Sequence, residues 1–435
     1  MRRRLRSSRF RLLHGASWRV RITFWVGALT VGAASALFAI SGTAAENLFL
    51  AMHERFPWWP WLTLGLGLPL LAWISNRWFP AAKGSGIPQA IAVLQTHSGH
   101  SLRDSVLSLR VAVAKMVLTV GGLACGASIG REGPTVHVGA AVMYSLGRFT
   151  RFPAHYMERG LVLAGGGAGV AAAFNTPLAG IMFALEEMYR SFDRRTSSVV
   201  LTAVILAGLV AIVILGNYDY FGHSTATFDL WQDWYVIPLV AVVGGLLGGS
   251  FSELLVFSTR QIAPYARRHP VRLAFVCGLA VALLGTLSGG SVYGSGYHEA
   301  RGLLEGEVAP QFVYPLMKLL TTLASYLSGI PGGIFAPSLS TGAGLGALFA
   351  QLFGAIDPSV IILLGMVAYF SGVVQTPITA FVIVMEMTSD PDMIIPMMAT
   401  SLVAAGTSRL VCRTPIYEAL ARDFLESTGY IGHSR

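Results

Sequence analysis

Apolar residues run through most of this chain in long blocks instead of alternating with polar ones. Between residue 22 and about residue 410, these blocks follow one another with few charges inside them. A large water-soluble core would instead show regular alternation of apolar and polar positions. The pattern therefore predicts an all-α protein that crosses a membrane many times.

The apolar blocks predict helices of unequal length. Several are too short for the roughly 30 Å hydrocarbon core of a bilayer. Short apolar helices that begin at glycine or proline are typical of broken helices that end inside a membrane and line a site. The expected ranges are 22–40, 59–77, 105–124, 135–148, 158–174, 177–190, 199–216, 233–258, 271–289, 312–327, 338–354, 358–373, 376–388 and 392–410.

Composition agrees with a polytopic membrane protein and adds an orientation. The 435 residues are 54% hydrophobic and 12% charged, and the mean hydropathy is +0.60. The net charge of +9 does not indicate nucleic-acid binding, because eight arginines lie within residues 1–21 and the rest scatter mostly through short loops. By the positive-inside rule, 1–21 is expected to be a basic cytoplasmic N-terminus. The small residues at 42–45 resemble a signal cleavage site, but the apolar run before them is long enough to span, which favours a retained helix.

Two segments of the chain resemble each other at nearly the same spacing. NTPLAGIMFALE at 175–186 aligns without gaps on QTPITAFVIVME at 375–386. At an offset of 203, Gly130, Pro134, Gly139 and Ala140 recur as Gly333, Pro337, Gly342 and Ala343. Two ordered matches predict an internal duplication, and duplicated membrane halves place a binding site at their interface. The expected organisation is a first membrane repeat at 22–220, a second repeat with a C-terminal helix at 231–428, and a tail at 429–435.

Three glycine-rich motifs precede predicted helix starts. KGSGIPQ at 83–89 offers the Ser85 hydroxyl and nearby amides to an anion, although a serine N-cap in an ordinary loop is a common alternative. PGGIFAP at 331–337 presents the amides of Ile334 and Phe335 at the positive end of a helix dipole. The alternative for this motif is a small-residue packing contact between helices.

The third motif, GREGP at 130–134, adds charge to the same arrangement. Pro134 suits the first turn of a helix, and a glycine-rich helix start is an anion site. Because Glu132 lies beside that site, its carboxylate could occupy it and leave when protonated, which would make it a gate. The alternative is an interfacial loop in which Arg131 and Glu132 simply face water.

Acidic and hydroxyl side chains supply further candidates. Glu186 has an identical counterpart at 386, which indicates a structural role, whereas Glu187 aligns with a methionine and is the better candidate for carrying protons. A glutamate at an aqueous helix end beside Arg190 is the alternative. Tyr417 can donate to an anion without carrying charge, although interfacial tyrosines are common.

Nothing in the sequence favours an enzyme or a metal site. GASIG at 126–130 matches the G-x-S-x-G pattern of serine hydrolases, with Ser128 as nucleophile and His137 nearby. That pattern belongs to a soluble strand–turn–helix setting, which is absent here, so an intramembrane hydrolase remains only a distant alternative. The three cysteines lie far apart and are expected to be packing residues.

Taken together, these motifs resemble the CLC family of chloride channels and proton-coupled chloride transporters. GSGIP at 84–88, GREGP at 130–134 and GGIFAP at 332–337 stand in the family's order, followed by a tyrosine in the last helix. The resemblance covers about 22–426. It implies an all-α membrane fold of two inverted repeats with many tilted, part-spanning helices, and a homodimer with one pathway per subunit.

The resemblance also implies roles for particular residues. Ser85 and Tyr417 are similar to the family's inner anion ligands, and the amides of Ile334 and Phe335 to its central-site donors.

On the outer side, Glu132 matches the gating glutamate, and the amides near Arg131 and Gly133 match the outer anion site. Glu187 matches the internal proton glutamate of the family.

Within this resemblance, the variable positions imply a chloride/proton antiporter, and no cofactor is expected. Serine at 85 favours chloride over nitrate, GREGP and GSGIP argue against the fluoride-selective branch, and the acid at 187 favours an exchanger. A passive chloride channel of the same fold stays open as the alternative. Only 18 residues follow Tyr417, so a prokaryotic inner-membrane member without CBS domains is expected.

Overall fold

The computed structural model describes residues 15–96, 100–149, 154–189, 194–216, 221–222, 228, 233–354, 356–388, 390 and 392–428. Within these ranges every regular element is a helix, and the only strand-like pairing is two isolated backbone bridges. The predicted tail at 429–435, most of the basic segment 1–21 and most of the polar interval 217–232 lie outside the described residues. The predicted all-α class is confirmed.

The first half of the chain folds into helices of very unequal length. In chain order these are α2 (Gly15–Arg55), α3 (Trp59–Leu62), the π-helical turn η1 (Thr63–Gly67), α4 (Leu68–Trp78), η2 (Pro80–Ala82), α5 (Ile87–Gln95), α6 (His100–Val106), α7 (Leu109–Ala124), α8 (Glu132–Phe149), α9 (Ala154–Phe174), α10 (Pro177–Phe183), the π-helical turn η3 (Ala184–Tyr189) and α11 (Arg194–Leu215).

The second half has a similar mixture of long and short helices. They are α12 (Val236–Arg268), α13 (Pro270–Leu287), α14 (Tyr297–Leu304), α15 (Tyr314–Leu327), α16 (Phe335–Leu352), α17 (Pro358–Val374), α18 (Pro377–Thr388), α19 (Ile394–Val411) and α20 (Ile416–Ser427).

Several helices extend beyond their predicted ends. α2 was expected to end at residue 40, yet it continues to Arg55 and contains the cleavage-like stretch 42–45. Residues 41–55 contain alanine, leucine, methionine and glutamate, which favour helix, and no proline until Pro57. α8 begins at Glu132, three residues before the predicted start at 135. The acidic residue is therefore the first residue of the helix instead of standing in the loop before it.

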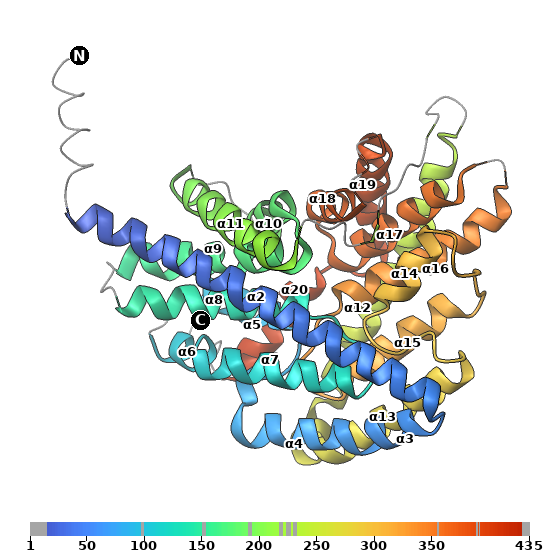
Figure 1. Ribbon diagram of the computed structural model, residues 1–435, viewed down its shortest axis with the longest axis horizontal. Helices are drawn as coiled ribbons and strands as arrows, with labels where there is room; N and C mark the ends of the chain where they lie inside the picture. The colour runs from blue at the N-terminus through green and yellow to red at the C-terminus, as the bar shows by residue number, and fades with distance from the viewer. Residues whose placement is uncertain are drawn as a thin grey trace.

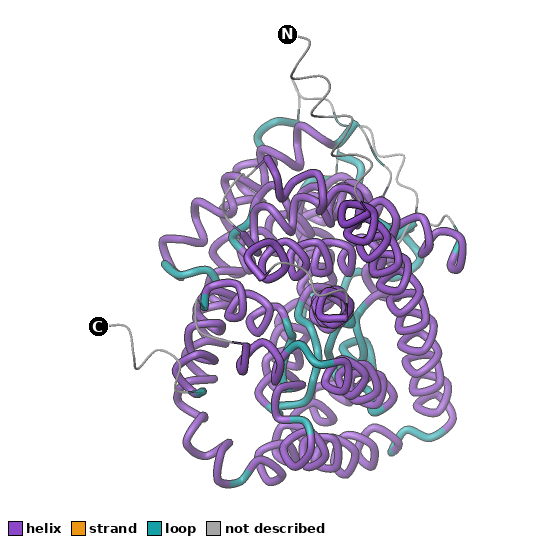
Figure 2. Tube along the Cα trace, turned by 90° about the vertical axis from the view of Figure 1, so that its left-hand side faces the viewer, coloured by secondary structure: helices purple, strands orange, loops and turns teal. Residues whose placement is uncertain are grey.

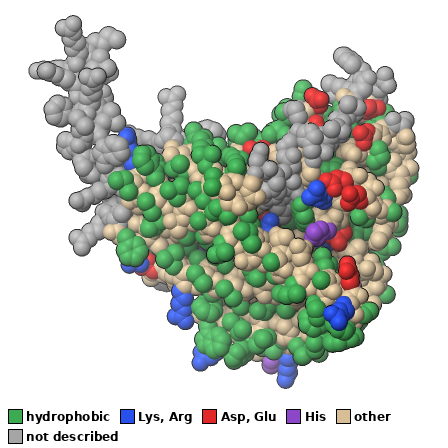
Figure 3. Space-filling view, in the orientation of Figure 1, with side chains coloured by type: hydrophobic (Ala, Val, Ile, Leu, Met, Phe, Trp, Pro, Cys, Tyr) green, Lys and Arg blue, Asp and Glu red, His purple; other side chains and the backbone are tan. Residues whose placement is uncertain are grey.

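The length and surface of the helices suit a bilayer. In the described part of the chain, five helical segments are long and apolar enough to cross a membrane: Arg21–Arg55, Ser101–Ala124, Val236–Arg268, Pro270–Leu287 and Ile394–Val411. Figure 3 shows hydrophobic side chains spread over the visible face among uncharged polar side chains and backbone, with charged side chains mainly at the lower edge and on the right.

The longest helices surround an interior where the chain is not helical. α2 crosses the face seen in Figure 1, and the first-half helices lie mostly to the left of the second-half helices. Figure 2 shows loop segments collected in the middle of the molecule, with helices around them. Such irregular backbone is tolerated at membrane depth only where protein or a polar cavity covers it.

The two halves contain matching close crossings between helices. α8 crosses α9 where Gly139 meets Gly165, and α16 crosses α17 where Gly342 meets Gly365, and at each of these glycines a Cβ atom would collide with the backbone of the other. Small residues let membrane helices approach this closely. Gly139 and Gly342 belong to the predicted repeat match, so the packing supports the duplication inferred from the sequence.

Candidate functional site

The three glycine-rich motifs meet in the middle of the fold. Gly130 and Gly333 exchange two backbone hydrogen bonds, each 2.7 Å long. The N–H of Gly332 donates to the carbonyl oxygen of Gly84 at 3.3 Å, and Gly84 forms a parallel bridge with Pro331. Residues from positions 84, 130 and 333 thus form one cluster.

Four helices begin at or beside this cluster. α5, α8, α16 and α20 start at residues 87, 132, 335 and 416. The first N–H groups of a helix have no carbonyl one turn earlier to bond, and they form the positive end of its dipole. The cluster therefore offers backbone donors from both halves of the chain to an anion.

The carboxylate of Glu132 occupies one of these helix starts. Glu132 is 1% exposed, and its carboxylate interacts with the backbone N–H groups of Glu132 itself and of Ala336 in the first turn of α16. One carboxylate oxygen lies directly over Gly130, where a Cβ atom would collide with it. The acid from the first half is therefore bound at the helix start of the second half. The alternative in which Glu132 faces water is wrong.

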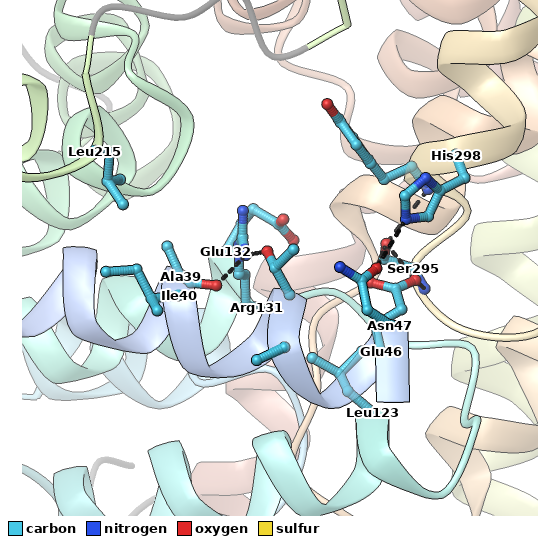
Figure 4. A pocket seen from close by; sticks show the side chains of 13 residues that line it. Ala39, Ile40, Glu46, Asn47, Leu123, Arg131, Glu132, Leu215, Ser295 and His298 are labelled. Atoms are coloured by element: carbon cyan, nitrogen blue, oxygen red, sulfur yellow. Dashed lines mark hydrogen bonds between the residues drawn. The ribbon is translucent and has the colours of Figure 1, made fainter. Parts of the chain in front are cut away.

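The Arg131 side chain extends to α2 and binds two residues of that helix. Its guanidinium donates to the carbonyl oxygen of Ala39 at 2.6 Å and to the hydroxyl of Thr43 at 2.8 Å. Figure 4 shows Arg131 and Glu132 on one side of a pocket of about 490 Å³. Because this pocket reaches Glu132, it connects the buried carboxylate with the outside of the helix cluster.

Two hydroxyl groups lie on the other side of the cluster. Ser85 and Tyr417 are both 0% exposed and lie close to each other, yet among the described residues neither hydroxyl has a hydrogen-bond partner of normal geometry. The Ser85 oxygen also lies against Gly133. Ser85 does not cap α5, because the N-cap residue is Gly86 in a left-handed conformation. Buried hydroxyls without partners fit a small anion that accepts hydrogen bonds.

Ile334 and Phe335 lie between the two sides. Ile334 is the N-cap of α16 and Phe335 is its first residue, and both are 1% exposed. The ring of Phe335 packs against Tyr417 at 5.8 Å between centroids and against Phe370 at 4.9 Å. These ring contacts fix the start of α16 beside the final helix.

Glu187 lies in the π-helical turn η3 instead of the regular helix expected over 177–190. Its side chain is 2% exposed and interacts electrostatically with Tyr417. The alternative of a glutamate at a water-exposed helix end is therefore wrong, and Arg190, the neighbour that it invoked, lies outside the described residues. Short π-helical turns occur frequently at functional sites.

A second pocket, of about 910 Å³, shares no described lining residue with the first and reaches the cluster at Gly84. Its lining includes Gly84, next to Ser85, and the end of α20. Four basic side chains line this pocket against two acidic ones: Lys83, Arg260, Arg267 and Arg422 against Asp423 and Glu426. An excess of positive charge at a cavity mouth raises the local concentration of anions.

One buried cation beneath the cluster was missed in the sequence. Lys115 is 0% exposed, and its ammonium donates to the carbonyl oxygens of Gly84 at 3.1 Å and of Lys83 at 3.4 Å. The signal was a lysine in the middle of the apolar block 105–124, because an ionisable residue inside a membrane helix is a functional candidate by default. Its counterpart, 203 residues on, is Lys318.

The hydrolase pattern has no catalytic geometry. The hydroxyl of Ser128 pairs with the hydroxyl of Thr322 at 3.0 Å, and the Nε2 atom of His137 lies 2.9 Å from the carbonyl oxygen of Val106. The serine and the histidine thus have separate partners. In the described part of the chain, no group of three or more His, Cys, Asp or Glu side chains could hold a metal.

Comparison with known proteins agrees with this geometry. Residues 67–409 match the family model described as voltage gated chloride channel. This chain belongs to that family. The hydrolase alternative is thereby excluded, and the chain is a membrane transport protein, not an enzyme.

Relatives of known function extend over most of the chain. The H+/Cl− exchange transporter ClcA of Vibrio campbellii is 32% identical over 421 residues, which cover 90% of this chain and 86% of the relative. ClcA of Cronobacter sakazakii is 30% identical and covers 85% of this chain and 82% of the relative.

Solved structures share the CLC fold. A slow cyanobacterial Cl−/H+ antiporter matches with a TM-score of 0.79 and 25% identity, over 94% of this chain and 99% of that chain. A CLC-type fluoride/proton antiporter matches with a TM-score of 0.77 and 24% identity, over 92% of this chain and 96% of that chain. The second likeness concerns the fold alone.

Proposed function

We propose that this chain exchanges chloride for protons across a membrane. The observation that carries the proposal is the Glu132 carboxylate bound at the first turn of α16. Those backbone donors suit any small anion, so the carboxylate and a transported anion compete for the same place. The family relatives named as H+/Cl− exchangers support chloride and protons as the two substrates.

Chloride is held by neutral donors along the pathway. The hydroxyls of Ser85 and Tyr417 serve the inner side, and the amides of Ile334 and Phe335 serve the centre. Hydroxyls and amides replace the anion's hydration without a fixed positive charge, which would hold the anion too tightly for passage. No cofactor takes part, and chloride is the substrate.

Glu132 couples the two ions. While ionised, it fills the amide site beside Gly130. Once protonated, it loses its electrostatic attraction to the positive end of α16 and moves out, and chloride takes its place. The amides near Arg131 and Gly133 then serve the outer anion site. Each time chloride replaces the Glu132 carboxylate, the carboxyl group has taken up a proton, so chloride and protons cross the membrane in opposite directions.

Glu187 supplies protons from the other side of the membrane. It is buried and lies within electrostatic range of Tyr417, as does Glu132. An ionisable side chain buried in a membrane protein is expected to take part in a proton pathway. Protons reach Glu132 from Glu187 by a route separate from that of chloride.

We infer the cellular setting and the oligomeric state from the family and from the charge distribution. We place the protein in a bacterial inner membrane, with the basic N-terminus in the cytoplasm, as a homodimer with one pathway per subunit. Cysteine labelling of the N-terminal segment in intact and permeabilised cells tests the orientation. The mass of the purified protein in detergent tests the dimer.

One reconstitution experiment tests the exchange. Liposomes containing the protein are given a chloride gradient, and the external pH is recorded. Uphill proton movement is expected in the unaltered protein, and its absence alongside rapid chloride flux would indicate the passive channel. Glu132→Ala is expected to retain chloride flux while proton movement falls to background. Proton pumping by Glu132→Ala would refute the coupling role.

A further inference from the structure

The GSG sequence of the first motif occurs a second time, at 294–296, where the structure repeats the same backbone. Gly84 and Gly294 both have φ of 64°, and Gly86 and Gly296 have φ of 103° and 80°. A helix follows immediately in each case, α5 from residue 87 and α14 from residue 297. Ser295 is therefore the structural counterpart of Ser85.

The two loops also rest on matching lysines. Lys318 is 0% exposed, and its ammonium donates to the carbonyl oxygens of Val292 at 3.1 Å and Gly294 at 2.9 Å. Lys115 makes the equivalent contact with the loop at 84–86. In both repeats a buried ammonium accordingly binds the loop carbonyls and leaves the serine hydroxyl and amide free to point elsewhere.

The two serines differ in what they bind. Whereas the Ser85 hydroxyl has no partner of normal hydrogen-bond geometry among the described residues, Ser295 binds the carboxylate of Glu46. The Ser295 amide donates to Glu46 Oε1 at 2.6 Å, and its hydroxyl lies 2.9 Å and 3.0 Å from the two carboxylate oxygens. Figure 4 shows the two side chains together at the pocket that also reaches Glu132.

The surroundings of Glu46 hold charges of both signs. Glu46 lies on α2 and is 8% exposed. The ammonium of Lys318 attracts it, while the carboxylates of Glu299 and Glu132 repel it. Among the described residues, removing Glu46 would leave Glu299 as the remaining carboxylate that attracts the Lys318 charge. A small anion entering beside Ser295 would restore the lost negative charge.

We propose that the loop at 294–296 is a latent halide site whose resident anion is the Glu46 carboxylate. A carboxylate oxygen and a halide ion both accept hydrogen bonds from a hydroxyl and a backbone amide, and Ser295 supplies both donors. Glu46 thus keeps the second repeat's site closed to chloride, whereas Ser85 leaves the first repeat's site open to it. Glu46→Ala opens the site to chloride or bromide.

The direct test is bromide binding in Glu46→Ala, located by anomalous scattering from crystals of the full-length protein. One additional bromide per subunit is expected within hydrogen-bond distance of the Ser295 amide and hydroxyl. The double variant Glu46→Ala/Ser295→Ala should lose it. Glu54→Ala, an exposed glutamate on the same helix, is the matched control and should show the bromide sites of the unaltered protein.

Thermal unfolding in detergent provides a second measurement, which does not require crystals of the variant. In detergent, bromide should raise the unfolding temperature of Glu46→Ala more than that of Glu54→Ala, with gluconate as the salt control, because a ligand stabilises the state that binds it. If Glu46→Ala does not fold, Glu46→Thr replaces it with the same expectation. A folded variant without bromide at Ser295 and without extra stabilisation overturns the proposal. Neither measurement depends on transport, so failure of the halide-site proposal can be distinguished from failure of the chloride/proton exchange proposal.

Discussion

Glu186, in η3, caps the first turn of α18, which carries Glu386, and Glu386 caps the first turn of α10, which leads directly into η3. The Glu186 carboxylate accepts the backbone N–H groups of Ile378 at 3.2 Å and Thr379 at 2.6 Å. Glu386 in turn accepts those of two residues at the start of α10, at 3.0 Å and 2.7 Å. Such an exchange of equivalent contacts is the signature of a two-fold axis. It explains why Glu186 is duplicated along the chain while Glu187 is not.

This reciprocity predicts matched losses of stability. Glu186→Gln and Glu386→Gln should each lower the free energy of unfolding by about 1–2 kcal/mol, because a neutral amide is a weaker acceptor for two helix-start amides. Thermal unfolding in detergent measures both, with exposed Glu307→Gln as the control. A large loss in one variant and none in the other would contradict the two-fold relation.

The unpartnered hydroxyls lead to the opposite expectation for stability. Ser85→Ala and Tyr417→Phe each remove a buried hydroxyl that has no hydrogen-bond partner of normal geometry among the described residues. The free energy of unfolding in chloride-free buffer should therefore change by less than about 1 kcal/mol. Chloride affinity, measured by calorimetry, should fall several-fold in both. Unchanged affinity would remove these hydroxyls from the pathway.

Gly130→Ala should move the Glu132 carboxylate without altering its chemistry. A methyl group at Gly130 would occupy the place of the carboxylate oxygen. We expect proton coupling in liposomes to fall toward that of Glu132→Ala, while chloride flux persists. Gly160→Ala is the control, because a Cβ atom there meets nothing within 4 Å. Full coupling in Gly130→Ala would mean that the carboxylate need not lie over this glycine.

Glu187→Gln separates proton supply from chloride movement. The amide keeps the size of the side chain but cannot take up a proton at ordinary pH. Chloride flux in liposomes should continue while proton flux falls to background, with Glu307→Gln as the control. Coupled exchange that persists in Glu187→Gln would leave this residue a structural role in η3.

The sequence predicted the site best where a candidate functional residue lies in the same short motif as the glycines and proline that begin a helix. Glycines before a proline require a close approach at a helix start, so GREGP and GGIFAP led directly to Glu132 and Phe335. The Glu186 duplication was visible as an identity, and its structural role followed from symmetry. These inferences depend on local sequence, which is why they agree with the fold.

What could not be predicted depends on partners distant in the chain. The second GSG at 294–296 is plain in the sequence, but it lacks the following proline, and only the matching backbone identifies Ser295 with Ser85. Glu46 gave no signal, because its acceptor role comes from a loop about 250 residues away. Lys115 was visible as a lysine within an apolar block, but its contact with the carbonyl oxygen of Gly84, 31 residues away, does not follow from local sequence.

The contact between Gly130 and Gly333 uses backbone atoms alone. The hydrogen bonds that join the two halves at this point therefore do not depend on the chemistry of the neighbouring side chains. Substitution at positions such as 85, 132 or 335 can change which ion is accepted and whether it is coupled, while the frame that positions those residues stays the same. In agreement with this, the same fold occurs in a solved Cl−/H+ antiporter and in a solved fluoride/proton antiporter.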